Sequence, residues 1–262
     1  MKVGFYQFSP VFGEPQKNLE KISEHLLKCD ADIAVLPELA FTGYLFIEKK
    51  EVLNLSETVP GSISNKLKEI AIKKDMAIVT GFAELVEDKV YNSALLITPD
   101  GNINIYRKNH LFHEEKLFFE PGDSGFPVFT VKGVKIGILV CFDHFFPEAA
   151  RSLALQGAQI ICHPANLVIP QKAQITTRAR SIENKIFWIL ANRIGTEIRG
   201  EKKFTYPGLS QISDPEGRVM VQAGEFEEGF FAVDINPDLA KNKSITPLCS
   251  LFDDRRTDIY LL

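Results

Sequence analysis

The sequence predicts an α/β sandwich with mixed sheets, and two features of its apolar pattern support this fold class. Segments with apolar residues at helical spacing separate short, buried strand-like runs, which is typical of crossover connections between parallel strands. Other strand-like runs follow one another across short turns rich in proline, aspartate, glycine and asparagine, which is typical of antiparallel hairpins. Both kinds of connection together favour mixed sheets over an all-parallel doubly wound sheet.

The first part of the chain has the crossover pattern. We expect a strand at residues 2–8, a helix at 15–29, a buried strand at 31–36 and a second helix at 62–74, with Ser62 as the cap of that helix. The chain therefore opens with alternating strands and helices.

The rest of the chain combines hairpins with helices. Strands are expected at 76–85, 90–98 and 102–107, and a hairpin is expected between 128–131 and 134–140. The remaining expected elements are a helix at 147–156, a strand at 159–163, a helix at 171–184, a strand at 186–192, a hairpin of 208–213 with 219–222, and a strand at 230–235.

The composition is typical of one enzyme-sized domain spanning residues 1–262. With 45% hydrophobic residues, the chain can bury a substantial core without disulfides or a metal. Its 34 acidic and 30 basic residues are scattered, so we expect no nucleic-acid partner and no binding to anionic membranes. The tail at 236–262 carries several large apolar residues, and we expect it to pack on the body or on a second subunit.

The cysteines are expected to be free thiols in the cytoplasm. The N-terminal segment lacks the pattern of a signal peptide, and no apolar stretch approaches the roughly 20 residues that span a bilayer. Cys29, Cys141, Cys162 and Cys249 show no Cys-x-x-Cys spacing, and we interpret Cys162 and Cys249 as structural. Among the histidines only His110 and His113 lie at ligand spacing, so we expect no metal and no other cofactor.

Cys141 is the candidate nucleophile. A buried strand runs directly into it, and a helix is expected to begin six residues later. Such a turn places backbone N–H groups and a helix dipole near the sulfur, which favours the thiolate. The alternative is an inert core thiol, because free cysteine is among the most buried residue types.

Two charged residues also lie at strand ends. Glu38 closes the run ADIAVLPE, and Lys108 closes NINIYRK. Each taken alone is compatible with an ordinary surface charge. A thiol amidase, however, needs a base for the thiol proton, a cation for the oxyanion and a backbone N–H beside the nucleophile. Glu38, Lys108 and the N–H of Phe142 can supply these three.

Four segments together resemble the successive signatures of the nitrilase, or carbon–nitrogen hydrolase, superfamily: LPELAFTGY at 36–44, YRKNHLF at 106–112, EEKLFFEPGD at 114–123 and VCFDHFFPEAARSLALQGAQIICHPAN at 140–166. The resemblance covers essentially the whole chain. It implies an α-β-β-α sandwich that forms at least a homodimer, and a catalytic triad at Glu38, Lys108 and Cys141. It also implies a second active-site glutamate at Glu115, for which Glu114 is the alternative.

Further residues are candidates for the substrate pocket. We assign Tyr44, His144, Phe145 and Asn166 to it, although His144 and Phe145 are equally compatible with simple packing and Asn166 with capping a turn. Arg180 and Glu183, three residues apart on a helix, are expected to form an ion pair that stabilises the fold, because side chains at this spacing are neighbours on the helix surface.

The expected reaction is cleavage of a carbon–nitrogen bond through a Cys141 thioester. The nucleophile motif is Cys-Phe-Asp, whereas nitrile-cleaving branches of the resembled family typically have Cys-Trp-Glu. A small amide or N-carbamoyl amine is therefore favoured over a nitrile as substrate. An acyltransferase, in which an amine captures the thioester, and an inactive binding protein are the remaining alternatives.

Overall fold

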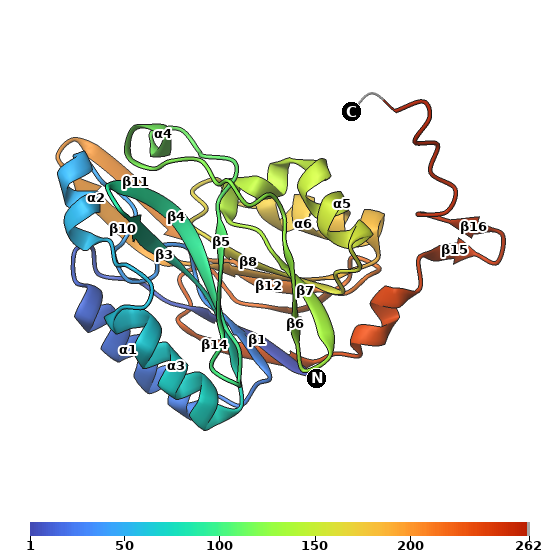
Figure 1. Ribbon diagram of the computed structural model, residues 1–262, viewed down its shortest axis with the longest axis horizontal. Helices are drawn as coiled ribbons and strands as arrows, with labels where there is room; N and C mark the ends of the chain where they lie inside the picture. The colour runs from blue at the N-terminus through green and yellow to red at the C-terminus, as the bar shows by residue number, and fades with distance from the viewer. Residues whose placement is uncertain (261–262) are drawn as a thin grey trace.

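The computed structural model describes residues 1–260, and its core is two six-stranded mixed sheets (Figure 1). In the first sheet, parallel strands lie in the middle and antiparallel strands lie on both sides. Its strands, in spatial order, are β14 (Gly229–Asp234), β1 (Lys2–Gln7), β2 (Ile33–Val35), β3 (Ala77–Val86), β4 (Lys89–Ile97) and β5 (Ile103–Arg107).

The second sheet repeats this arrangement. Three parallel strands again form its centre, with the antiparallel strand β6 on one side and the antiparallel pair of β12 and β13 on the other. The order is β13 (Val219–Gln222), β12 (Gln211–Ser213), β9 (Phe187–Asn192), β8 (Ile160–Ala165), β7 (Val134–Ile138) and β6 (Val128–Val131).

Helices cover the outer face of each sheet. Helices α1 (Pro15–Lys28) and α3 (Ser62–Lys74) lie on the first sheet, and α5 (Pro147–Leu155) and α6 (Lys172–Asn184) lie on the second (Figure 1). The predicted α-β-β-α sandwich with mixed sheets is therefore confirmed. Arg180 and Glu183 of α6 form the expected ion pair at 3.0 Å.

The main hydrophobic core lies between the two sheets. Alternate residues of β1 and β2, such as Phe5 and Val35, are fully buried together with Ile160 and Ile189 of the second sheet. A separate core fills the space between the first sheet and its helices, where Leu19, Ile22 and Leu26 of α1 pack with Ile63, Leu67 and Ile70 of α3. Burial on both faces explains why the central strands are continuous apolar runs.

The cap of α3 differs from the expectation. Gly61 is the N-cap, and Ser62 is already the first helical residue. The carboxylate of Glu57 accepts the N–H of Ile63 at 2.8 Å and the hydroxyl of Ser62 at 2.7 Å. A carboxylate from outside the helix therefore takes the place of the predicted serine cap, and it also suits the positive end of the helix dipole.

Several short elements add to the predicted ones. They are mainly short or polar, and they lie outside the two large sheets: α2 (Lys49–Leu55), α4 (Glu115–Phe118), the hairpin β10 (Ile194–Arg199) with β11 (Lys202–Pro207), 3-10 helices at Cys141–Phe145 and Pro237–Lys241, and the hairpin β15 (Ser244–Thr246) with β16 (Cys249–Ser250).

The tail after β14 extends away from the sandwich (Figure 1). Phe252 packs against the core edge, where the Arg151 guanidinium and the Lys243 ammonium each lie 5.0 Å from the centre of its ring. Leu248, at the tip of the β15–β16 hairpin, is 92% exposed. Within residues 1–260, no helix is both long enough and apolar enough to cross a membrane.

Candidate active site

The candidate site lies where strands of both sheets end. Strand β5 runs in the same direction as β2 and β3, so Lys108 follows β5 at the edge where Glu38 follows β2. Cys141 and Asn166 follow the parallel strands β7 and β8 of the facing sheet. The sandwich therefore brings together residues that lie far apart in the sequence, as expected at the carboxyl ends of parallel strands.

A close backbone approach positions Glu38. Gly81 of β3 donates its N–H to the Pro37 carbonyl and accepts the N–H of Ala40, both at 3.0 Å. A Cβ atom at Gly81 would lie 2.4 Å from the Cα of Glu38. The loop that carries the glutamate can lie against β3 only because position 81 has no side chain.

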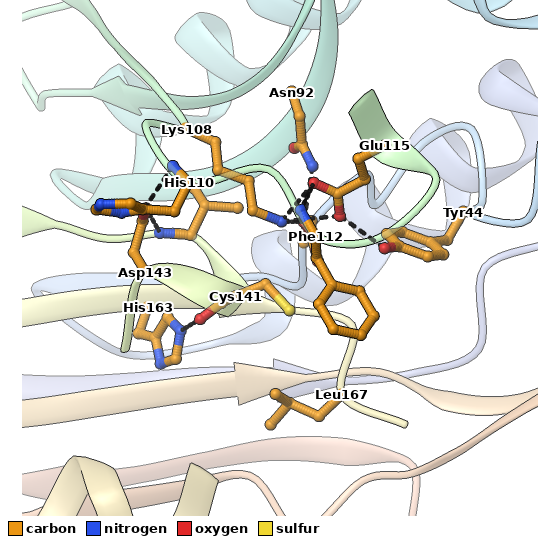
Figure 2. Close-up of polar contacts among 12 residues, drawn as sticks. Tyr44, Asn92, Lys108, His110, Phe112, Glu115, Cys141, Asp143, His163 and Leu167 are labelled. Carbon is orange, nitrogen blue, oxygen red and sulfur yellow. Dashed lines mark hydrogen bonds and ion pairs between the residues drawn. The ribbon is translucent and has the colours of Figure 1, made fainter. Parts of the chain in front are cut away.

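Lys108 is buried between two carboxylates, and Figure 2 shows it beside one of them, Glu115. Its Nζ donates to Glu38 Oε1 and to the carboxylate of Glu115, each at 2.8 Å. Burial lowers the pKa of Lys108, but the charges of Glu115 and Glu38 outweigh burial and raise its pKa above the ordinary value. The lysine is therefore a permanent cation inside the protein.

Glu38 has one oxygen occupied and one oxygen available. Asn92 Nδ2 donates to Oε1 at 2.7 Å, and Lys108 donates to the same oxygen. Oε2 is buried and has no hydrogen-bond partner in the described part of the chain. Burial raises the pKa of Glu38, the charge of Lys108 opposes this shift and Glu115 adds to it. A carboxylate with a raised pKa is a better proton acceptor.

Cys141 begins a 3-10 helix in a left-handed backbone conformation, with φ of 42°. His163 Nε2 lies 2.9 Å from the Cys141 carbonyl oxygen, and Trp188 Nε1 donates to His163 Nδ1 at 3.2 Å. Because Nδ1 accepts from the indole, Nε2 carries the proton and donates to that carbonyl. A neutral histidine thus holds the strained turn, and burial lowers its pKa to about 4.

Asp143 ties the same turn to the other sheet. Its Oδ2 accepts the N–H of Val140 at 2.9 Å and the hydroxyl of Tyr106 at 2.7 Å. Its Oδ1 accepts the backbone N–H of His110 at 3.1 Å, and His110 Nδ1 lies 2.7 Å away. His110 is therefore engaged with Asp143, and residues 1–260 contain no group of three or more His, Cys, Asp or Glu that could hold a metal.

The thiol is not favoured as a thiolate by its position alone. Burial raises the pKa of Cys141 well above its usual range, and the charge of Glu38 raises it further. Lys108 and the backbone N–H of Asn166 lower it by less. The expectation that the strand-to-helix turn favours the thiolate is therefore wrong for the resting site, and deprotonation needs a base.

Glu115 lies inside the site and Glu114 does not. Glu115 is 4% exposed, and it accepts the Tyr44 hydroxyl at 2.6 Å and the Phe112 N–H at 3.1 Å in addition to Lys108 (Figure 2). Glu114 points outward and pairs with Lys202 at 2.5 Å. Residues 115–118 form a short helix with Glu114 as its N-cap, so neighbouring side chains do not alternate as they would in a strand. The two glutamate side chains nevertheless point in different directions.

An ion pair absent from the sequence analysis positions Tyr44. Arg193 and Glu197 form a buried pair, and the Glu197 carboxylate accepts the N–H groups of Tyr44 at 3.1 Å and of Leu45 at 2.8 Å. The Arg193 guanidinium also lies over the ring of Tyr206, 4.2 Å from its centre. Glu197 lies on a polar hairpin and Arg193 just before it, so these two buried charges leave no apolar pattern in the sequence.

A small cavity of about 30 Å³ opens beside Cys141. The predicted pocket residues His144, Phe145 and Asn166 line it together with Phe142, whereas Tyr44 lies at Glu115. Burial lowers the pKa of His144 to about 2, so its imidazole is neutral. Its Nδ1 lies 2.6 Å from the Thr176 hydroxyl.

Known proteins resemble this chain along most of its length. The family model described as carbon-nitrogen hydrolase matches residues 2–243. A nitrilase from Pyrococcus abyssi is 43% identical over 99% of both chains. An N-carbamoylputrescine amidase from Solanum lycopersicum is 34% identical over 88% of this chain and 83% of its own.

A solved structure is also similar. A variant of the amidase from Nesterenkonia sp. AN1, in a form showing the result of Michael addition of acrylamide at the active site cysteine, superposes with a TM-score of 0.78. It is 26% identical and covers 93% of this chain and 96% of its own.

Proposed function

This chain belongs to the carbon-nitrogen hydrolase family and is a hydrolase, and on that premise we propose that it cleaves a small amide or N-carbamoyl amine through a thioester on Cys141. One observation carries the proposal: a buried lysine lies between two carboxylates, 2.8 Å from each, in the site that contains the thiol. A base, a fixed cation and a nucleophile are the minimum set for acyl transfer to a thiol.

In the first step Glu38 takes the proton of Cys141. The available Oε2 of Glu38 is the acceptor, and the raised pKa of this carboxyl group suits it to the task. The sulfur attacks the amide carbon, and the carbonyl electrons move to the oxygen. Lys108 Nζ and the N–H of Phe142 stabilise the resulting oxyanion.

In the second step the carbon–nitrogen bond breaks. The proton held by Glu38 passes to the leaving nitrogen, the carbonyl reforms and ammonia or an amine departs from the thioester. Glu38 then takes a proton from water, the hydroxide attacks the thioester and the carbon–sulfur bond breaks. The thiol is restored with the proton from Glu38, and the acid product leaves.

Glu115 orients the cation and the substrate. It holds Lys108 at 2.8 Å and receives the Tyr44 hydroxyl at 2.6 Å, so both neighbours have fixed positions. Burial and the charges of Glu115 and Glu38 raise the pKa of Tyr44 well above its ordinary value, which keeps it a hydrogen-bond donor.

A nitrile is the second candidate substrate. The relative from Pyrococcus abyssi, similar over the full length, is named a nitrilase. The same thiol attack on a nitrile gives a thioimidate, which two water additions convert to the acid and ammonia. The Cys-Phe-Asp motif at 141–143 favours the amide, by the resemblance described above.

The test is ammonia release from a matched series, namely butyramide, butyronitrile and N-carbamoylbutylamine, with purified wild-type protein and the Cys141→Ala variant. We expect the amide or the carbamoyl compound to give the higher kcat/KM, and the variant to be inactive. Faster turnover of butyronitrile would replace the proposal with a nitrilase. Formation of an N-acyl amine in place of the acid, when an amine is added, would indicate an acyltransferase.

A further inference from the structure

Asn166 has a buried carboxamide whose polar atoms are unpaired. The residue follows β8, is 3% exposed and lines the cavity beside Cys141. Neither Nδ2 nor Oδ1 has a hydrogen-bond partner among residues 1–260. Buried donors and acceptors are normally paired, because an unpaired one loses its hydration without compensation. A ligand that pairs both atoms would therefore be favoured at this position.

The surroundings of Asn166 are apolar or neutral. Leu167, Val168 and Ala173 line the same cavity, and His144 carries no charge at neutral pH. Lys172 also lines it but is exposed to solvent. A charged group on the substrate would therefore have no buried counter-charge here, and burying it unpaired would be costly.

The position of Asn166 assigns it to the acyl part of the substrate. Lys108, Glu38 and Glu115 act on the scissile bond and do not line this cavity. Asn166 and its apolar neighbours line the cavity on which Cys141 opens. With Cys141 bonded to the acyl carbon, the remainder of the acyl group extends along that wall. The cavity of about 30 Å³ favours a short acyl chain.

We propose that Asn166 is a specificity-determining residue that binds a second, neutral carboxamide group on the acyl side of a short substrate. This inference rests on the proposed function. A carboxamide presents a donor beside an acceptor, so it can pair both Asn166 atoms at once. A hydroxyl group carries its donor proton and its acceptor lone pairs on one oxygen atom, so it cannot align with Nδ2 and Oδ1 as two parallel hydrogen bonds. A carboxylate offers acceptors alone, which would oppose Oδ1.

The experiment compares two amides of the same size. Propanediamide carries the second carboxamide, and 3-methylbutanamide replaces it with an apolar group of the same shape. We expect Asn166→Leu to lower the ratio of their kcat/KM values, diamide over apolar amide, by about tenfold or more, because two hydrogen bonds are lost for one substrate only. Val168→Ala, on the same wall, is the control and should change both values alike.

Stability provides a second readout. Because the Asn166 carboxamide has no partner in residues 1–260, Asn166→Leu should keep or raise the melting temperature. Asn166→Ala is the second variant if leucine does not fit, and it should lower the same ratio.

Four outcomes would overturn the inference. Unchanged kcat/KM values for both amides in both Asn166 variants, with active wild-type protein, would overturn this inference alone. An equal loss for both amides would assign Asn166 to the reacting group and also overturn it. If the wild-type protein hydrolyses the butyl compounds of the proposed function but not propanediamide, this inference alone fails; if it hydrolyses none of these compounds, the proposed function fails and the inference fails with it.

Discussion

At the scale of single residues, the site depends on one cation shared by two carboxylates. Lys108 neutralises part of the charge of Glu38 and Glu115, and each of these raises the pKa of the lysine. Glu38 Oε2 has no hydrogen-bond partner among residues 1–260, while the two oxygens of Glu115 accept from Tyr44 and Phe112. The two glutamates are therefore chemically different although both contact the same ammonium.

Replacement of Lys108 by a neutral residue should lower the rate strongly. We expect Lys108→Met to lower kcat by about 100-fold or more, since removal of one oxyanion donor typically costs that much. Arg107→Met is the control: Arg107 bonds Glu84 at 2.9 Å and lies outside the site, so its loss should lower the melting temperature more than the rate. Equal losses of kcat in the two variants would contradict the role given to Lys108.

The assignment of Glu115 to the site can be tested by comparing it with its neighbour Glu114. Glu115→Gln preserves shape but removes the charge beside Lys108, so acylation should slow, measured as ammonia released in a single turnover. Glu114→Gln should leave that rate nearly unchanged, because Glu114 pairs with Lys202 at the surface. If Glu114→Gln is the slower variant, the assignment of Glu115 is wrong.

At the scale of elements, the strands of the two sheets could be predicted from the sequence, and the residues just past their ends indicated where the site lies. Buried strands are apolar on both faces, so β1, β3, β7 and β9 have clear signals in the sequence. Residues just past such strands lie at one edge of the sandwich. This is why Glu38, Lys108 and Cys141 could be named together before their distances were known.

The elements that sequence reasoning missed are polar or very short. Hairpin β10–β11 carries charged residues on both strands and leaves much of its surface exposed, so it lacks the alternation of a half-buried strand. Its Glu197 becomes buried only through Arg193 and the loop at Tyr44. Contacts of this kind depend on tertiary structure and leave no local pattern.

The hairpin should act on catalysis through Tyr44. Glu197→Gln weakens the hold on the Tyr44 backbone, and Tyr44→Phe removes the hydroxyl bonded to Glu115. We expect each variant to lower kcat more than it raises KM, and the double variant to lose no more than the larger single loss, because both act through one contact. Additive losses would show that Glu197 stabilises the fold independently of Tyr44.

At the scale of the whole molecule, the tail leaves apolar side chains without cover. Leu248 is 92% exposed, and Ile245 of the same hairpin is 54% exposed. Phe252 packs on the body, so only some of the apolar side chains of the tail are covered within one chain. Exposed apolar side chains gathered on one hairpin are typical of a protein–protein contact.

We therefore expect a homodimer or a larger homo-oligomer that covers the β15–β16 hairpin. Sedimentation velocity of the wild-type protein should show no monomer at micromolar concentration, and Leu248→Asp should shift the distribution toward the monomer. Lys241→Asp, which changes charge at an exposed position before the hairpin, is the matched control. A monodisperse wild-type monomer would contradict this expectation.

Acylation of Cys141 can be measured as the intact mass of protein quenched in acid during turnover of butyramide. We expect an added butyryl mass that maps to Cys141, is absent in Cys141→Ala and persists in Cys162→Ala, whose thiol is buried in β8. Cys141→Ala should also release no ammonia while its melting temperature stays nearly unchanged. Substantial ammonia release by a folded Cys141→Ala variant would show that Cys141 is not the nucleophile.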